Sequence, residues 1–119
     1  MGLVIGEIWT YKATKPNDNL EKVRPVLIIG DDEDNGLKFV DITYVIISSS
    51  ASCGKYDIKI SEELAKSIGL NRKSVIKTTK IYTGSKMKLG NKICDLPNEI
   101  RNEFKQKYVE YQKNIIDKW

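Results

Sequence analysis

Histidine is absent from the 119-residue chain. Imidazole is the usual proton carrier near neutral pH, so its absence excludes histidine-based ribonuclease chemistry, Ser-His-Asp hydrolysis and every His-ligated zinc site. Any catalysis must therefore depend on Arg, Lys, Ser, Thr, Tyr or carboxylate side chains. The length predicts a single domain over residues 1–119, with one modest hydrophobic core.

Cysteine and long apolar runs are also scarce. Cys53 and Cys94 have no third or fourth cysteine beside them, which indicates free thiols rather than a metal cluster or a disulfide framework. The acidic turn at 31–36 lacks the bidentate glutamate of a calcium loop. The apolar run Leu3-Val4-Ile5 is too short for a signal peptide or a membrane span. We expect a cytoplasmic protein that has no membrane association and needs no metal or cofactor.

Charge is divided unevenly along the chain. Residues 1–50 carry five basic and eight acidic side chains, whereas residues 51–119 carry fifteen basic and eight acidic ones. A stretch of seven cations contains no Asp or Glu: Arg72, Lys73, Lys77, Lys80, Lys86, Lys88 and Lys92. Such a stretch is typical of a surface that binds a polyanion, because Lys and Arg displace counterions from phosphates. A solvated strand that resists edge aggregation explains it equally well.

Strands dominate the predicted secondary structure. Segments rich in β-branched and aromatic residues predict strands over 3–12, 23–29, 37–47, 56–60 and 73–83, with a short closing strand at 93–94. Asn35-Gly36 favours a tight hairpin between the second and third strands. Both faces of the third strand are largely apolar. One face must fill a core, and the other must be covered by a helix, a barrel wall or a second subunit.

Two helices complete the predicted fold. Ser61 is the expected N-cap of a helix of under two turns that stops at Gly69. A longer helix opens at Asp95-Leu96-Pro97. Its apolar residues recur at three- and four-residue spacing and should pack on the sheet: Ile100, Phe104, Tyr108, Tyr111, Ile115 and Trp119. The pattern predicts a mainly β fold, a small SH3-like barrel of five to six curved antiparallel strands with a short helix and a C-terminal capping helix.

Arg24 is the most informative polar residue. It lies beside Pro25 at the start of an apolar strand, where its planar guanidinium can bind a phosphate through two hydrogen bonds. A rim arginine paired with Glu21 or Asp18 explains the same residue. The run from Ser48 to Ser50 ends the third strand, either as hydroxyl donors or as ordinary loop serines.

The order of three segments resembles the MazF/PemK family of toxin ribonucleases: Gly6-Glu7-Ile8-Trp9, Val23-Arg24-Pro25-Val26-Leu27-Ile28-Ile29 and Ile46-Ile47-Ser48-Ser49. The likeness continues through Ile60-Ser61, Gly69-Leu70, Ser74-Val75-Ile76, Ile81-x-Thr83 and Lys86-x-x-Leu89. The resemblance implies the toxin of a type II toxin-antitoxin system. Such a toxin is a homodimeric SH3-like barrel that cleaves single-stranded RNA at short sequences without a metal, and a cognate antitoxin inhibits it.

The resemblance also implies catalytic residues. Arg24 takes the place of the family's arginine, and Ser48 or Ser49 takes the place of its threonine or serine. In this role Arg24 stabilises charge on the phosphorane and the serine donates a hydrogen bond to a phosphoryl oxygen, giving 2′,3′-cyclic phosphate and 5′-hydroxyl ends. Glu21 is only a nearby substitute for a glutamate that some members use, so the proton acceptor stays unassigned.

Further residues are candidates for binding RNA. Trp9 and Tyr82 are expected to stack on bases, and Lys77, Lys80 and Lys86 to follow the backbone. The chain has Thr79-Lys80 where members often carry an acidic or amide pair, so the family gives no base preference. Two non-catalytic alternatives use the same fold: an inhibitor of a protein target such as a topoisomerase, or a barrel that binds nucleic acid without cutting it.

Overall fold

The structure is a computed structural model that describes residues 5–14, 21–38 and 41–119. The described strands are β1 (Glu7–Thr14), β2 (Glu21–Asp31), β3 (Asp41–Ser48), β4 (Ile58–Ile60), β5 (Ser74–Ser85) and β6 (Leu89–Asp95). The helices are α1 (Glu62–Ile68) and α2 (Asn98–Ile116), with 3-10 turns η1 (Asp32–Asn35) and η2 (Lys86–Lys88). The prediction of a mainly β fold with one short and one long helix is confirmed.

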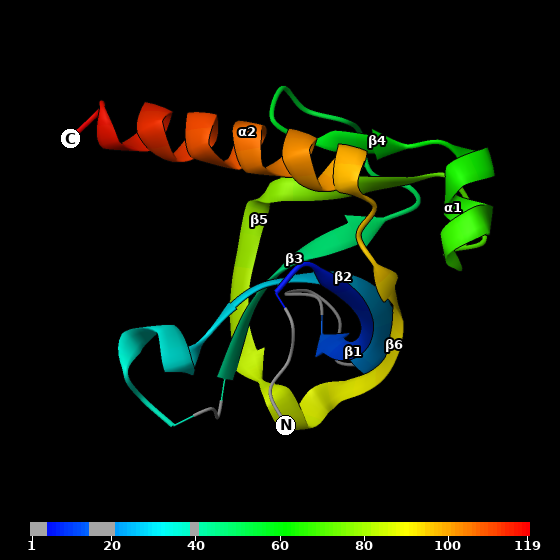
Figure 1. The fold of residues 1–119 in the computed structure, drawn as a ribbon, viewed down its shortest axis with the longest axis horizontal. Helices are drawn as coiled ribbons and strands as arrows, with labels where there is room; N and C mark the ends of the chain where they lie inside the picture. The colour runs from blue at the N-terminus through cyan, green and yellow to red at the C-terminus, as the bar shows by residue number, and fades with distance from the viewer. Residues whose placement is uncertain (1–4, 15–20, 39–40) are drawn as a thin grey trace.

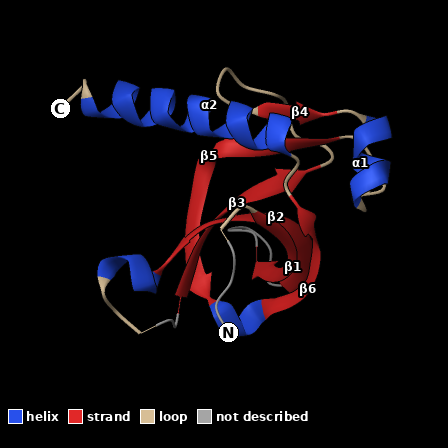
Figure 2. Ribbon diagram, viewed as in Figure 1, coloured by secondary structure: helices blue, strands red, loops and turns tan. Residues whose placement is uncertain are grey.

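The described strands form one six-stranded antiparallel sheet in the order β4-β5-β3-β2-β1-β6. The sheet curls strongly, and β1, β2 and β6 wrap around one end of the molecule (Figures 1 and 2). Strand pairing within the described residues stops at β4 on one edge and at β6 on the other. The fold is therefore a curled sheet rather than the closed barrel that the term SH3-like suggests.

Strand β3 is apolar on both faces, as predicted, and each face belongs to a separate core. Val45 and Ile47 lie in an outer cluster that α2 covers with Ile100 and Phe104. The opposite face contributes to an inner cluster, which is made of Tyr11, Val26, Ile28, Ile42 and Tyr44. The Tyr11 and Tyr44 rings are in contact although β2 separates their strands, so the inner cluster fills the inside of the curl. A helix and the curled sheet cover both faces within one chain.

The connection between β2 and β3 differs from the predicted tight hairpin. It runs through η1, and Gly36 follows in the left-handed region with φ 73°. The Asp31 carboxylate accepts the Glu33 N–H at 2.9 Å, and the Asp32 carboxylate accepts the Asp41 N–H at 2.8 Å. These side-chain hydrogen bonds stabilise a longer turn, because a carboxylate satisfies the backbone donors at the start of a helical turn. The prediction of a two-residue turn at Asn35-Gly36 was wrong.

Helix α1 begins where the sequence predicted, whereas α2 begins at Asn98, just after the predicted opening at Asp95-Leu96-Pro97, because Asp95 still belongs to β6. The Ser61 hydroxyl accepts the Leu64 N–H at 3.2 Å and caps α1, which ends at Gly69. The first half of α2 packs on the sheet, but the second half extends beyond it (Figure 1), and Trp119 is fully exposed. The predicted apolar stripe is therefore confirmed for Ile100 and Phe104 and wrong for Trp119. Neither helix in the described part of the chain is long and apolar enough to cross a membrane.

Candidate functional site

The ends of β2 and β3 bring Arg24 and Ser48 to one face of the sheet. Val26 lies opposite Ile46 in this antiparallel pair, and Arg24 and Ser48 each lie two residues further toward the same end. Side chains two residues apart on a strand point to the same face. The guanidinium and the hydroxyl thus lie on the face of the inner cluster, at one end of the curl.

The Arg24 side chain has an unsatisfied donor. It is half-buried, and its Nε is buried without a hydrogen-bond partner among the described residues. A buried N–H that lacks an acceptor is costly, and an anionic oxygen is the strongest acceptor for a guanidinium. The environment of Arg24 therefore favours a ligand that brings a phosphate or carboxylate oxygen.

The Ser48 hydroxyl is held by the backbone that follows it. Its Oγ accepts the Ser50 N–H at 3.3 Å and the Ala51 N–H at 3.1 Å. A serine hydroxyl has two lone pairs and one hydrogen. Because both lone pairs accept protein N–H groups, the hydroxyl can offer a ligand only its hydrogen. Ser48 is thus arranged as a donor and not as a base.

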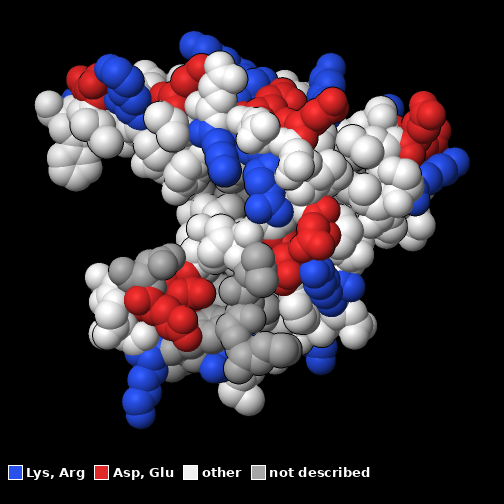
Figure 3. All heavy atoms as spheres, viewed as in Figure 1, with Lys and Arg blue, Asp and Glu red and all other residues white. Residues whose placement is uncertain are grey.

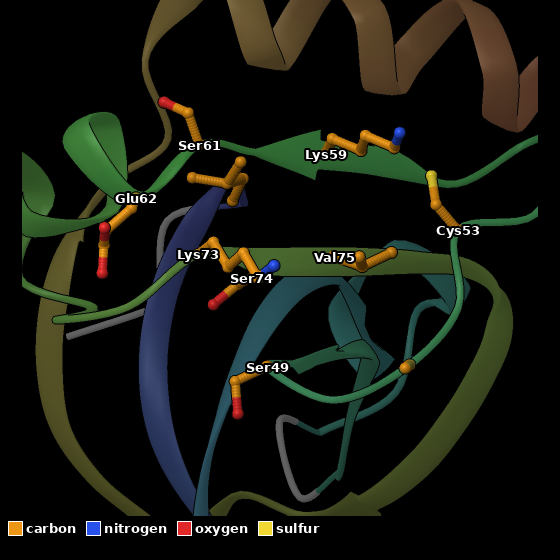
Figure 4. Close-up of a pocket in the computed structure, with 10 residues that line it drawn as sticks. Ser49, Cys53, Lys59, Ser61, Glu62, Lys73, Ser74 and Val75 are labelled. Carbon is orange, nitrogen blue, oxygen red and sulfur yellow. The ribbon is translucent and has the colours of Figure 1, made fainter.

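Ser49 lies just beyond the end of β3 and is exposed. It lines a pocket of about 470 Å³ between β3, β4 and the start of β5. Figure 4 shows Ser49 on one side of this pocket, Lys59 on β4, and Lys73 with Ser74 leading into β5. Two lysines and several hydroxyls give the pocket the chemistry of an anion-binding surface, although Glu62 also lines it.

Three tyrosines form a stack that reaches the surface. The Tyr11 and Tyr44 ring centroids are 4.7 Å apart, and those of Tyr44 and Tyr82 are 5.7 Å apart with an interplanar angle of 20°. Burial raises the pKa of Tyr44, and the neighbouring Tyr82 phenol raises it further. Tyr82 is 40% exposed, so one face of its ring is covered by Tyr44 while the side chain still meets solvent. It is the accessible end of an aromatic platform.

Trp9 lies on β1, and Glu21 is the first residue of β2. Trp9 is half-buried, packs against the inner cluster, and donates its indole N–H to Glu7 at 3.0 Å. Glu21 begins β2 opposite Thr14, which puts its backbone three residues before Arg24, but its side chain lies outside the described residues.

The predicted cationic stretch does not form one continuous surface. The Lys77 ammonium pairs with the buried Asp57 carboxylate at 2.6 Å, and Lys92 bridges Glu7 and Asp95 at 2.9 and 3.0 Å. Lys80 and Lys86 are exposed. On the face shown in Figure 3, acidic side chains gather at η1, and acidic and basic side chains are mixed along α2. Across the described residues, no three His, Cys, Asp or Glu side chains are grouped so that they could hold a metal ion.

Comparison with known proteins identifies the family. Residues 5–109 match the family described as PemK-like, MazF-like toxin of type II toxin-antitoxin system. The chain belongs to this toxin family. No curated protein matches it at a significant level.

Solved structures of MazF-like toxins share the fold. A mycobacterial endoribonuclease solved with its cognate antitoxin is 15% identical, with a TM-score of 0.68 over 92% of this chain and 93% of that one. The Mycobacterium tuberculosis toxin MazF-mt6 is 19% identical, with a TM-score of 0.62 over 84% and 91%. MazF in the MazE-MazF structure from Deinococcus radiodurans is 12% identical, with a TM-score of 0.68 over 92% and 94%. At these identities the likeness establishes the fold of the toxin.

Sequence reasoning missed two residues, Lys59 and Asp57. Lys59 lies on β4 and lines the Ser49 pocket together with Lys73, a member of the predicted cationic stretch. Asp57 is one of the acidic residues in the basic half of the chain. Its burial, at 4% exposure, is what distinguishes it from the other acids there. Burial of a single charged residue depends on long-range packing, and no local pattern signals it.

Proposed function

We propose that this toxin is an endoribonuclease that cleaves single-stranded RNA at short sequences in the cytoplasm, without a metal ion, and that a cognate antitoxin inhibits it. One observation carries the proposal. The Arg24 Nε, which has no hydrogen-bond partner among the described residues, and the Ser48 hydroxyl lie on one face at one strand end. The family membership and a structural neighbour that is described as an endoribonuclease in complex with its antitoxin support it.

The reaction is an attack of the ribose 2′-oxygen on the adjacent phosphorus. The 2′-hydroxyl proton leaves to an acceptor, the bond from phosphorus to the 5′-oxygen breaks, and that oxygen takes up a proton. The products are a 2′,3′-cyclic phosphate and a 5′-hydroxyl. Arg24 stabilises the extra negative charge of the phosphorane, and Ser48 donates its hydrogen to a phosphoryl oxygen. A guanidinium is a donor with no acceptor site, so Arg24 is not the base and the proton acceptor stays unassigned.

The surfaces beside Arg24 and Ser48 are suited to the flanking nucleotides. Lys59 and Lys73 in the Ser49 pocket offer contacts to backbone phosphates. Tyr82 offers a ring for a base, with Lys80 and Lys86 exposed nearby on the same strand and turn. We also propose a homodimer, because Ile116 at the end of α2 and Trp119 beyond it expose apolar surface, and such surface is commonly buried between subunits.

A cleavage assay tests the proposal directly. Purified protein should cut a mixed pool of single-stranded RNA in excess EDTA, and mapped 5′ ends should carry hydroxyls. Arg24→Ala should lose at least about 2.7 kcal/mol of transition-state stabilisation, as when an oxyanion donor is removed. Lys105→Ala is the control, since it removes an exposed cation of α2, which contributes no residue to the strand end. Full cleavage by the Arg24→Ala protein would refute the assignment.

The same assay separates Ser48 from Ser49. Ser48→Ala should lower kcat, because it removes the donor beside Arg24. Ser49→Ala should mainly raise KM, because Ser49 lines the neighbouring pocket. RNA binding without any product would instead favour the non-catalytic alternative, and growth arrest with intact cellular RNA would favour a protein target.

A further inference from the structure

We propose that Asp57 is a positioning residue for the reaction, acting on Ser48 through the loop 49–57 that joins β3 to β4. This inference rests on the proposed ribonuclease function. Asp57 does not face the site itself. It lies at the far end of the loop, packed against β5, and is 4% exposed.

The Asp57 carboxylate has a full set of donors. Oδ2 accepts the Gly54 N–H at 2.8 Å and the Lys77 ammonium at 2.6 Å, and Oδ1 accepts the Thr78 N–H at 3.1 Å. The Lys107 ammonium of α2 donates to the Asp57 carbonyl at 3.3 Å. A single buried carboxylate therefore ties the loop to β5, and its carbonyl ties the loop to α2.

Lys77 also connects an earlier part of the loop to β5. Its ammonium also donates to the Ser52 carbonyl at 2.8 Å. The residue just before Ser52 is Ala51, whose N–H holds the Ser48 Oγ at 3.1 Å. The chain of contacts thus runs from Asp57 through Lys77 and Ser52 to the backbone that orients the Ser48 hydroxyl.

This arrangement needs a carboxylate, because every group that faces Asp57 is a donor. Asparagine in its place keeps one acceptor oxygen. Its NH₂ group is a donor and would face another donor, either the Lys77 ammonium or a backbone N–H. Space is also tight, since a Cβ added to Gly54 would lie 3.1 Å from Asp57 Oδ2. Asp57→Asn should therefore loosen the loop around Ser48 without changing any group that touches RNA.

The test is a double-mutant cycle with Ser48, using the full-length protein and an RNA that the wild type cleaves. Asp57→Asn should lower kcat by about tenfold or more, the scale of a misplaced catalytic group. Its KM should change by less than about twofold, because no RNA contact is lost. In the Ser48→Ala background the same substitution should leave kcat unchanged. Glu110→Gln is the matched control, because Glu110 is exposed on α2 and accepts a hydrogen bond from Gln106 of the same helix.

A purely structural role gives a different result. In that case Asp57→Asn lowers kcat by the same factor with and without Ser48, and this outcome overturns the proposal. If the Asp57→Asn protein does not fold, Lys77→Met replaces it in the cycle, since it releases Ser52 while the two backbone donors to Asp57 remain. An independent RNA contact by Lys77 would instead appear as a raised KM and a smaller salt dependence of binding.

Amide hydrogen exchange provides a measurement that does not depend on activity. In Asp57→Asn the Ser50 and Ala51 amides should exchange at least about tenfold faster, while those of α2 should keep their protection. Unchanged protection at Ser50 and Ala51 overturns the proposal. If the wild-type protein cuts no RNA, the proposed function fails, and the exchange result still decides whether Asp57 holds the loop.

Discussion

Replacing Tyr82 with alanine should weaken RNA binding by an amount that the tyrosine stack sets. One face of the Tyr82 ring is covered by Tyr44, with the ring centroids 5.7 Å apart. Only the other face is left for a base, so a single stacking interaction is lost. Stacking of a base on an aromatic side chain contributes about 1–3 kcal/mol, which corresponds to an increase of about 5- to 140-fold in Kd.

The assay is fluorescence anisotropy with a labelled single-stranded RNA, in an Arg24→Ala background so that the RNA stays intact. Tyr82→Phe is the matched control, because it keeps the ring and removes only the hydroxyl. It should bind within about twofold of the parent protein if the contact is stacking. Lys80→Ala gives the contrasting result, a lower salt slope by about one, because it removes a phosphate contact.

Two results would refute this reasoning. Unchanged affinity in Tyr82→Ala would show that no base stacks on the exposed end of the platform. An equal loss in Tyr82→Phe would show that the hydroxyl, and not the ring, makes the contact. Far-ultraviolet circular dichroism of each variant excludes unfolding as the cause of a weaker Kd.

Two further predictions concern stability and ionisation. Phe104→Ala should lower the free energy of unfolding by about 3–5 kcal/mol, because its buried ring fills the core under α2, whereas Met87→Ala, at an exposed side chain of η2, should change it by less than about 0.5 kcal/mol. Urea unfolding of both variants measures the difference, and equal effects would contradict the packing of α2. In an absorbance titration of tyrosinate, Tyr44 should ionise above the ordinary value of 10.0, so the amplitude of the late part of the titration should fall in Tyr44→Phe. Because its folded pKa is raised, the stability that Tyr44 contributes is present below pH 10 and is lost as the pH rises through the folded pKa.

The sequence predicted those features that depend on neighbouring residues. Ser61, two glutamates and Gly69 specify a short helix by local hydrogen bonds, and the structure has that helix. The two apolar faces of β3 follow from strand alternation, and both are buried. Asn35-Gly36 shows the limit of this approach, because the carboxylates of Asp31 and Asp32 form a different turn at the same place.

By itself the sequence determined a histidine-free, mainly β chain with Arg24 and a run of serines at the ends of two apolar strands. Only the tertiary structure separated Ser48 from Ser49, because the register of β2 and β3 places Ser48 at the strand end beside Arg24, whereas Ser49 lies beyond the strand and lines the neighbouring pocket. In the structure, Lys77 and Lys92 of the predicted cationic stretch form ion pairs with acids that are up to 85 residues away in the sequence. A count of charges along the sequence does not show which acid each cation pairs with. Whether a cation faces an incoming polyanion or a buried carboxylate depends on which distant strands the fold brings together.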